Sequence, residues 1–370
     1  MDATRTIPFF NYPALFQTQE KELLAVITDV CRRGAYILQK DLRDFEANLA
    51  SFLNVKHAFG VANGTDALII ALRAAGVEPG DEVIVPSHTY IASAASIHFA
   101  GAKPVLVECA PDHMIDPKSA ARAVTKRTKA IMPVQLNGRT AEMDALQAIA
   151  DRHGLLIVED AAQGLGSKFR DRCAGTFGVA GTFSFYPAKV LGCFGDGGAV
   201  VTNDDAIARK VALLRDHGRD KDGRVVKWGL NSRLDNLQAA ILDFKLKTYP
   251  REIARRREIA ARYEAGLGDL AQLALPPTPD ADPAHFDVYQ NYEIEADRRD
   301  GLREHLEQRG VRTIIQWGGT PVHQFKELGL KASLPYTDRF FTRCMMLPMN
   351  TTLSDDDIDY ICAAIRDFYR

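Results

Sequence analysis

The chain has 370 residues, of which 46% are hydrophobic and 25% are charged, and its formal net charge is −2 at pH 7. These values are typical of a globular protein that is long enough for two domains and a large buried core. A net charge near zero excludes the strongly basic composition of many nucleic-acid-binding proteins and gives no attraction to an anionic membrane. We therefore expect neither nucleic acid nor a membrane among its partners.

The N-terminal stretch MDATRTIPFFNYPALFQTQEKELL carries no basic segment followed by an apolar run. It therefore does not resemble a signal peptide, and no apolar stretch is long and uncharged enough to cross a bilayer. The six cysteines form no C-x-x-C pair, and the nine histidines show no metal-binding spacing. These patterns predict reduced thiols, no metal site and a cytoplasmic location.

The first predicted element is an amphipathic helix, because apolar residues recur at helical spacing. They are Leu23, Leu24, Ile27 and Val30. From about residue 55 to 205, short apolar runs alternate with helical patterns, which predicts a mostly parallel sheet covered by helices on both faces. The expected strands are AFGVA, DEVIVP, PVLVE, KAIMPV, LLIVED and GTFSFY, and the helices between them are ALIIALRAAG, ASAASIHFAG, SAARAVTK and MDALQAIADRHG.

The last third of the chain follows a different pattern. A long helical stretch from Leu234 to Gly266 is interrupted once by a proline, and a proline-rich loop runs from Leu275 to Pro283. A strand (VYQNYEIEA), a helix (RRDGLREHLEQRG), a second strand (VRTIIQ) and a closing helix from about Ser354 are expected after it. We predict a large domain over residues 1–248, which includes the N-terminal helix, and a smaller α+β domain over residues 249–370.

The first motif with a chemical signature is GVANGTDALIIALRAAG. In this motif a strand ends at Ala62, residues 63–66 turn, and a helix begins. Exposed backbone N–H groups at a helix start carry partial positive charge and, with the hydroxyl of Thr65 beside them, suit a phosphate group. The alternative is a simple helix cap, because Thr65 or Asp66 at this position stabilises a helix by itself.

The second motif is GLLIVEDAAQG, in which Asp160 ends a strand that should be central in the sheet. Open α/β sheets bind ligands at the carboxyl ends of their strands. A carboxylate buried there needs a partner, because desolvation otherwise drives it neutral. The alternative is that Asp160 only caps the following turn.

The third motif is SFYPAKVLGCFGDGGAVV, in which one lysine, Lys189, lies among apolar residues and glycines. Burial lowers the pKa of a lysine, and its neutral amine is a nucleophile that forms Schiff bases. Ser184, five residues earlier, is a further candidate phosphate ligand. Taken singly, Lys189 is more typical of a lysine that reaches the surface, and the GDGG glycines are typical of a tight turn.

The order of these three motifs in one α/β domain indicates pyridoxal 5'-phosphate. The loop would hold the phosphate, Asp160 would pair with the protonated pyridine nitrogen, and Lys189 would hold the aldehyde. Such a site also needs an aromatic side chain against the ring. Tyr90, in VPSHTYIASA, lies at a strand end and suits that place.

With these motifs the sequence resembles the DegT/DnrJ/StrS family, the pyridoxal-phosphate sugar aminotransferases with the type I aspartate aminotransferase fold. The resemblance covers most of residues 34–242, and the C-terminal third matches more loosely. The matching segments are GAYILQKDLRDFEANLASFLNVKHAFGVANGTDAL, GDEVIVPSHTYIASA, VEDAAQGLG, FSFYPAKVLGCFGDGGAVVTND and GLNSRLDNLQAAIL. It implies a large α/β domain with a mostly parallel, seven-stranded type of sheet between helices, followed by a smaller C-terminal α+β domain.

The resemblance also implies roles for individual residues. Lys189 would be the catalytic Schiff-base lysine, with pyridoxamine 5'-phosphate as the intermediate form of the cofactor. Asn231, in GLNSRLDNLQ, would reach the phosphate from the other subunit of a homodimer with shared active sites. The other implied cofactor contacts are Asp160 at the pyridine nitrogen, Gln163 near the ring hydroxyl, Tyr90 on the ring face, and Gly64, Thr65, Asp66 and Ser184 at the phosphate.

The sequence departs from the family where the sugar substrate is expected. The family often reads PVHLYG where this chain has PVQLNG, with Gln135 and Asn137. It often reads histidine-tyrosine-proline where this chain has Gln316 and Trp317. These differences leave the substrate open, and a lone histidine in this region is more often structural. The candidate substrate contacts are Tyr186, Trp317 and His323.

By resemblance, the chain passes an amino group from glutamate to a nucleotide-linked keto-sugar by a ping-pong mechanism. A 4-keto-6-deoxyhexose aminated at carbon 4 is favoured over amination at carbon 3. Lys189 argues against the sugar dehydratases of the same fold, which carry histidine in its place. Two alternatives stay open, namely an aminotransferase for a cyclitol or another ketone, and a non-catalytic regulator that binds the cofactor. The regulator would need a DNA-binding module, for which no residues are left over.

Overall fold

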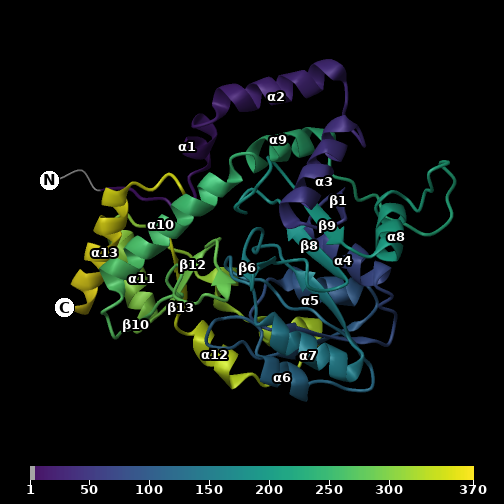
Figure 1. Cartoon of the computed structure of the whole chain (residues 1–370). Coiled ribbons are helices and arrows are strands. Elements are labelled where there is room, and N and C mark those ends of the chain that lie inside the picture. Colours follow the sequence, from purple (N-terminus) through teal and green to yellow (C-terminus); the bar gives the residue numbers. More distant parts are fainter. Residues whose placement is uncertain (1–4) are drawn as a thin grey trace.

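A computed structural model describes residues 5–370, so the first four residues of the predicted large domain and of the N-terminal stretch lie outside the described part. Its centre is a seven-stranded sheet in the order β1-β9-β8-β5-β4-β2-β3. Figure 1 labels β1, β9 and β8 of this sheet, beside α3 and α4. The pairs that join β3, β2, β4, β5 and β8 are parallel, which confirms the predicted mostly parallel sheet. The strands are β1 (His57–Val61), β2 (Glu82–Pro86), β3 (Lys103–Val107), β4 (Thr128–Ile131), β5 (Leu156–Asp160), β8 (Ala180–Ser184) and β9 (Gly198–Thr202).

Strand β9 is the strand of this sheet that the sequence analysis did not name. It follows the GDGG glycines and pairs antiparallel with both β8 and β1, and Ser184 lies opposite Gly198 in the register. The segment 185–197, which carries Lys189, therefore connects two neighbouring strands of the sheet. Of the GDGG glycines, Gly195 and Gly197 lie in the connection before β9, and Gly198 is the first residue of β9.

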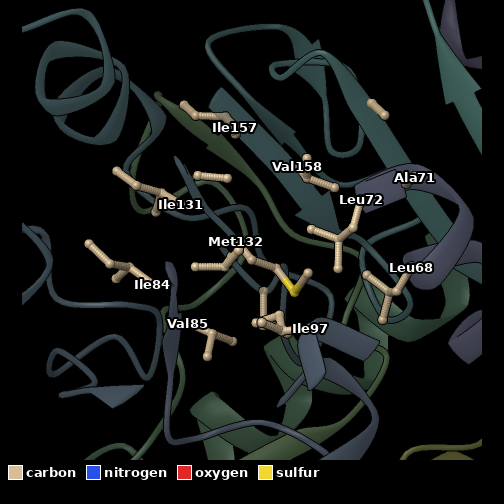
Figure 2. Packing of buried hydrophobic residues seen from close by; sticks show 14 of the residues in the cluster. Leu68, Ala71, Leu72, Ile84, Val85, Ile97, Ile131, Met132, Ile157 and Val158 are labelled. Carbon is tan, nitrogen blue, oxygen red and sulfur yellow. The ribbon is translucent and has the colours of Figure 1, made fainter. Parts of the chain in front are cut away.

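Helices cover both faces of the sheet, as predicted. On one face, α4 and α5 pack on the strands through a large apolar cluster that includes Leu68, Leu72, Ile84, Ile97 and Ile131 (Figure 2). On the other face, α3 and α9 pack on each other and on the sheet, and Phe45, Leu49, Phe183 and Leu242 lie in a second cluster. The helices of this part are α3 (Lys40–Leu53), α4 (Gly64–Ala74), α5 (Ile91–Phe99), α6 (Pro117–Arg122), α7 (Met143–His153), α8 (Asp205–Arg215) and α9 (Asn236–Leu246).

The C-terminal part begins with the long helix α10 (Tyr249–Leu267), one residue after the predicted domain boundary. It contains an antiparallel sheet in the order β10-β12-β13, packed with α10, α11 and α13 around an apolar cluster of its own. Its other elements are β10 (Leu273–Ala274), β12 (Tyr292–Ala296), α11 (Arg299–Gln308), η1 (Gln316–Gly319), η2 (Val322–Gln324), η3 (Lys326–Leu328), α12 (Pro335–Phe341), β13 (Cys344–Leu347) and α13 (Asp355–Tyr369). A small sheet in the order β11-β6-β7 links the two parts, with β6 (Lys168–Phe169), β7 (Arg172–Cys173) and β11 (His285–Phe286).

The predicted strand VRTIIQ is not formed. Val311 makes an isolated bridge with Ile7, and Ile314 makes one with Met346, so neither residue has enough partners for a continuous ladder. The bridge also shows that the start of the chain packs with the C-terminal part. Ile7 lies in the apolar cluster of that part, although the sequence analysis assigned it to the large domain.

The N-terminal helices α1 (Tyr12–Gln17) and α2 (Glu20–Arg33) lie at an edge of the molecule, where α2 runs along α9 (Figure 1). Leu23 and Val30 of the predicted amphipathic helix are buried, while Leu24 and the nearby Tyr36 stay exposed. Among residues 5–370, no helix combines the length and the apolar character needed to cross a membrane.

Candidate active site

The predicted site segments meet at the carboxyl edge of the large sheet. β5 ends at Asp160, β8 ends at Ser184, and β2 leads within four residues to Tyr90. β1 runs in the same direction as β8, because both are antiparallel to β9, and it leads through Asn63 into α4. The carboxyl ends of strands that run in one direction lie at one edge, which is where open α/β sheets hold ligands.

Asp160 is buried at this edge, with 5% of its surface exposed. Its Oδ1 accepts a hydrogen bond from the N–H of Ala162 at 3.1 Å, so it does cap the turn, as the alternative predicted. Its Oδ2 accepts the hydroxyl of Ser93 at 2.7 Å, a contact that the sequence analysis missed. Burial raises the pKa of the Asp160 carboxyl, against these hydrogen bonds and the charge of Lys189. The carboxylate therefore gains from a cationic partner in this site.

Lys189 lies close enough to Asp160 for their charges to interact. Burial lowers the pKa of its amine to about 8, although the negative charge of Asp160 acts in the opposite direction. At pH 7 roughly one Lys189 in ten then carries a neutral amine, against about one in three thousand for an ordinary lysine. The segment is held by Gln290, whose side chain accepts the N–H of Val190 at 2.7 Å and donates to the carbonyl of Ala188 at 2.7 Å. Sequence patterns gave no signal for Gln290.

The start of α4 offers open backbone donors beside Ser184. Asn63 caps this helix, because its side-chain oxygen accepts the N–H of Asp66 at 2.8 Å. The capping residue is therefore Asn63. The alternative in which Thr65 or Asp66 caps the helix is wrong. Within residues 5–370 the N–H groups of Gly64 and Thr65 have no acceptor. A methyl group on Gly64 would lie 2.9 Å from Cβ of Ser184, so the two residues are in direct contact.

Gly198 brings β9 close to the same loop. A methyl group on this residue would lie 2.5 Å from the carbonyl carbon and oxygen of Asn63, which no side chain can do without displacing the backbone. The last glycine of GDGG is therefore required by the close approach of β9 to the helix start. This contact fixes the loop that holds the open N–H groups.

Tyr90 and Tyr186 are exposed at the same edge, with 57% and 53% of their surfaces accessible. Gln163 follows Asp160 by three residues. Its Oε1 accepts the N–H of Asn137 at 2.8 Å and the side-chain amide of Asn291 at 3.3 Å. Its Nε2 has no acceptor in the part of the chain that the structure describes, so it is the group that Gln163 can offer to a ligand.

A family model described as the DegT/DnrJ/EryC1/StrS aminotransferase family matches residues 17–366. The chain belongs to this family. It is 43% identical over 372 residues to the dTDP-3-amino-3,4,6-trideoxy-alpha-D-glucose transaminase of Streptomyces venezuelae, covering 99% of this chain and 97% of the relative. The structure of S. venezuelae DesV in complex with a ketimine intermediate has a TM-score of 0.94, with 42% identity over 99% of both chains.

Another relative carries a different kind of name. The pleiotropic regulatory protein of Geobacillus stearothermophilus is 40% identical over 373 residues, which covers 98% of this chain and 99% of the relative. The family model and the relatives confirm the predicted family and the prediction of an aminotransferase. The similar solved structures confirm the predicted fold and pyridoxal phosphate as the cofactor.

The geometry of this family member fits that cofactor. The buried carboxylate of Asp160 suits a cationic ring nitrogen, the open N–H groups of Gly64 and Thr65 beside Ser184 suit a phosphate, and Lys189 supplies a reactive amine. Asp66 suits a phosphate less well, because its N–H is occupied by the cap and its side chain is an acid. Among residues 5–370, no group of three histidine, cysteine, aspartate or glutamate side chains is arranged to hold a metal ion.

Two residues singled out on the substrate side have no free polar atoms for a sugar. His323 is buried, with its Nδ1 2.7 Å from the hydroxyl of Ser87 and its Nε2 2.9 Å from Asp338. Gln135 is fully buried and donates to Glu159 at 2.7 Å, so the expectation that it faces the sugar is wrong. Gln135 had been singled out because it departs from the family pattern and His323 because it lies in the expected substrate segment, but both stabilise the interior.

Trp317 is half-buried, whereas Asn231 is exposed. Trp317 adopts a left-handed backbone conformation with φ of 50° and packs 5.3 Å from the ring of His88. Asn231 is exposed at the end of the segment 216–231, and it bridges to Asp216. In the same segment Trp228 is 95% exposed, which is unusual for a large apolar side chain.

Proposed function

We propose that the chain transfers an amino group from glutamate to a nucleotide-linked keto-sugar, with pyridoxal phosphate as its cofactor. The observation that carries this proposal is the meeting of Lys189, Asp160 and the open start of α4 at one edge of the sheet. The name of the Streptomyces relative, a transaminase of a dTDP-linked deoxy sugar, supports the substrate class.

The residues of the chain would divide the work as follows. When bound, pyridoxal phosphate supplies an aldehyde for covalent attachment of amines and a ring that draws electrons from the reacting carbon. The N–H groups of Gly64 and Thr65, with the hydroxyl of Ser184, would hold its phosphate. Asp160 would hold the ring nitrogen in its protonated form. Tyr90 would lie against the ring face.

Lys189 would then move the proton. Its Nζ, neutral in part of the molecules at pH 7, would accept the proton from the carbon that carries the amino group and would then donate it to the carbon on the other side of the shared nitrogen. Because the same site serves the amino donor and the keto-sugar in turn, we expect ping-pong kinetics.

For the position of amination we propose carbon 3 of the sugar. The sequence analysis favoured carbon 4, but the name of the Streptomyces relative places the amino group on carbon 3. The second candidate function is a non-catalytic regulator, which the name of the Geobacillus relative favours. A cyclitol or another ketone is the remaining alternative as amino acceptor.

A spectroscopic titration separates these possibilities. We expect glutamate alone to bleach the visible absorption of the purified protein, and a nucleotide-linked 3-keto-sugar to restore it with formation of an amino sugar. NMR of the product identifies the aminated carbon, and a panel of 3-keto-sugars, 4-keto-sugars and cyclitol ketones identifies the substrate class. No absorbance change with any amino acid would favour the regulator over the aminotransferase.

We also propose that the active protein is a homodimer in which Asn231 completes the site of the partner. The exposed Asn231 lies in the segment 216–231, where Val225, Val226 and Trp228 expose 70%, 56% and 95% of their surfaces. Apolar side chains exposed together are typical of a contact surface for another protein. An isologous two-fold dimer is the simplest assembly that completes both sites.

Mixing two defective variants tests the shared site. Asn231→Ala should weaken cofactor retention, and Lys189→Ala should be inactive. In a mixed dimer both defects fall in one site, and the other site is wild type. We therefore expect activity to return. Each mixed dimer has one intact site of two, so its activity should reach roughly half of that of a wild-type dimer. If subunit exchange is verified by mass spectrometry and activity stays absent, Asn231 serves its own chain.

A further inference from the structure

Glu293 is a buried carboxylate that none of the roles above uses. It lies on β12 in the C-terminal part, and its side chain is fully buried. Its Oε2 faces three residues of the large part, 3.3 Å from His88, 3.4 Å from His113 and 2.8 Å from the side-chain amide of Asn137. We call Glu293, His88, His113 and Asn137 the Glu293 cluster.

Both ring nitrogens of His88 face acceptor oxygens. Its Nδ1 lies 3.1 Å from the carbonyl oxygen of His113, and a carbonyl only accepts hydrogen bonds. Its Nε2 faces the carboxylate of Glu293, which also accepts only. His113 faces the carboxylates of Glu293 and Glu295 with its two nitrogens. His113, which lies between two carboxylates, is therefore cationic while Glu293 is ionised.

The pKa values agree with these charges. Burial opposes the charged form of His113, but hydrogen bonds and charge interactions with Glu293 and Glu295 outweigh it and raise the pKa of His113 to about 9. Burial likewise opposes the charged form of Glu293, but His88 and His113 hold the pKa of its carboxyl well below the usual range. Glu295 is bound in addition by Arg343 at 3.2 Å.

Aromatic rings pack against the histidines of the cluster. The ring centroid of Phe340 lies 4.7 Å from that of His88 and 4.4 Å from that of His113. The ring centroid of Trp317 lies 5.3 Å from that of His88. Within residues 5–370, Nε2 of His88 and Oε1 of Glu293 are buried without a hydrogen bond. Buried ion pairs with unsatisfied atoms seldom add stability over apolar residues of similar size. The cluster therefore needs an explanation other than stability.

Glu293 sets the direction of the amide hydrogen bonds around Asn137. Because the carboxylate accepts from Nδ2 of Asn137, the Oδ1 of Asn137 must point the other way. There it accepts the side-chain amides of Asn291 at 2.9 Å and Gln316 at 2.6 Å. Asn291 then donates to Oε1 of Gln163 at 3.3 Å. The chain of amides ends at Gln163.

The backbone of Asn137 makes this support necessary. Its φ of 55° is a left-handed conformation that costs energy in a residue with a side chain, and the same backbone donates its N–H to Gln163 at 2.8 Å. Four side chains, those of Glu293, Gln163, Asn291 and Gln316, thus meet at this one residue. Its position decides where Gln163 lies.

We propose that Glu293 is a positioning residue for the reaction, which acts through Asn137 to orient Gln163 so that its Nε2–H donates to the ring oxygen of the cofactor. The same amides anchor Gln316 and therefore the segment that carries Trp317. A charge buried in the C-terminal part thus fixes both the cofactor side and the predicted substrate side of the site. This inference rests on the proposed function, because it assumes the cofactor beside Gln163.

The test is a pH titration of the visible absorption of the cofactor-bound protein. Loss of a donor makes the ring oxygen more basic, so Glu293→Gln should move the midpoint upward by about one pH unit, a tenfold change in proton affinity. The turnover number should fall about tenfold while the KM for the sugar changes less. Glu295→Gln is the matched control, because Glu295 lies on the same strand and faces His113 without contacting Asn137. It should leave the midpoint unchanged.

A second variant guards against misfolding of Glu293→Gln. In Asn137→Gly the residue keeps its backbone N–H and adopts a left-handed φ without strain, but it has no side chain to link the turn to Glu293. It should shift the midpoint in the same direction. Nitrogen NMR of the histidine rings gives a readout that needs no cofactor, and the His113 ring should stay doubly protonated at pH 8 in the wild-type protein.

The outcomes are distinguishable. A wild-type midpoint in folded Glu293→Gln, or in Asn137→Gly when Glu293→Gln does not fold, contradicts the positioning role. A neutral His113 ring at pH 7 in the wild-type protein contradicts the ionised Glu293 on which this role depends, without reference to the cofactor. A wild-type protein that has no visible absorption even with added pyridoxal phosphate contradicts the proposed function, and the inference falls with it.

Discussion

Lys189→Ala is expected to abolish amino transfer, with a loss of at least about 10³-fold, because both covalent attachment and proton movement depend on one amine. Burial lowers the pKa of Lys189 to about 8, so its neutral form is accessible near pH 7. Borohydride added to the wild-type protein should attach the cofactor to Lys189, which peptide mass spectrometry detects. Steady-state rates with glutamate and a keto-sugar measure the loss.

The reactivity of Lys189 should also depend on pH in a fixed direction. Its pKa lies below the ordinary value of a lysine, so the neutral amine is lost as pH falls through about 8. Capture of pyridoxal phosphate by the cofactor-free protein should therefore slow about tenfold for each pH unit below 7 and level off above 8 to 9.

Lys245 is the matched control for this lysine. Burial lowers the pKa of Lys245 too, and its amine donates to the carbonyl of Gly192 at 2.6 Å, three residues from Lys189. Lys245→Met should keep most of the activity per folded molecule and lose some stability. Borohydride attachment at Lys245, or an active Lys189→Ala protein, would show that the lysine was assigned wrongly.

The sequence was sufficient to predict the large sheet and the segments that form the site. Strand patterns in this part are short and apolar, because the strands are buried on both faces, and the first four strands are each followed by a helix. Once the strands are parallel, their carboxyl ends must share an edge, so Asp160 and Ser184 come together by topology alone. That reasoning needs no knowledge of side-chain contacts.

The rest depends on contacts between residues far apart in the chain. Ser93 reaches Asp160 across 67 residues, and Gln290 holds the Lys189 segment across about 100. Neither leaves a local pattern. Strand β9 was missed because its glycines were interpreted as a turn, whereas the spacing of Gly198 from Asn63 explains them. His323 was named from its position near the substrate segment, but burial decides that it is structural.

The environment of Glu293 could not be predicted from the sequence either. In the sequence Glu293 belongs to VYQNYEIEA, where it looks like one acid of an alternating strand. Only the approach of His88, His113 and Asn137, each from a different strand end of the large sheet, makes it a buried charge. Asn137 and Gln316, where the sequence departs from the family, both belong to the amide chain that Glu293 begins.

Asp160→Asn should reduce the rate roughly 10³-fold, which corresponds to about 4 kcal/mol at about 1.4 kcal/mol per tenfold. Asparagine keeps an oxygen for the N–H of Ala162, and its amide can donate to the hydroxyl oxygen of Ser93, so the local geometry is preserved. What is lost is the negative charge that keeps a ring nitrogen protonated. The effect should appear in the turnover number of cofactor-saturated protein, measured with glutamate in single half-reactions.

Glu159 provides the control for this charge. It precedes Asp160 on β5 and points to the other face, where it accepts the N–H of Gly175 at 2.8 Å and the side chain of Gln135. Glu159→Gln should lower the melting temperature, because a buried acceptor for several donors is weakened, yet leave the half-reaction rate nearly unchanged. If Asp160→Asn reacts at close to the wild-type rate, the carboxylate does not serve the ring nitrogen. If Glu159→Gln loses as much activity as Asp160→Asn, the loss in both reflects the integrity of β5 rather than a charge at the cofactor.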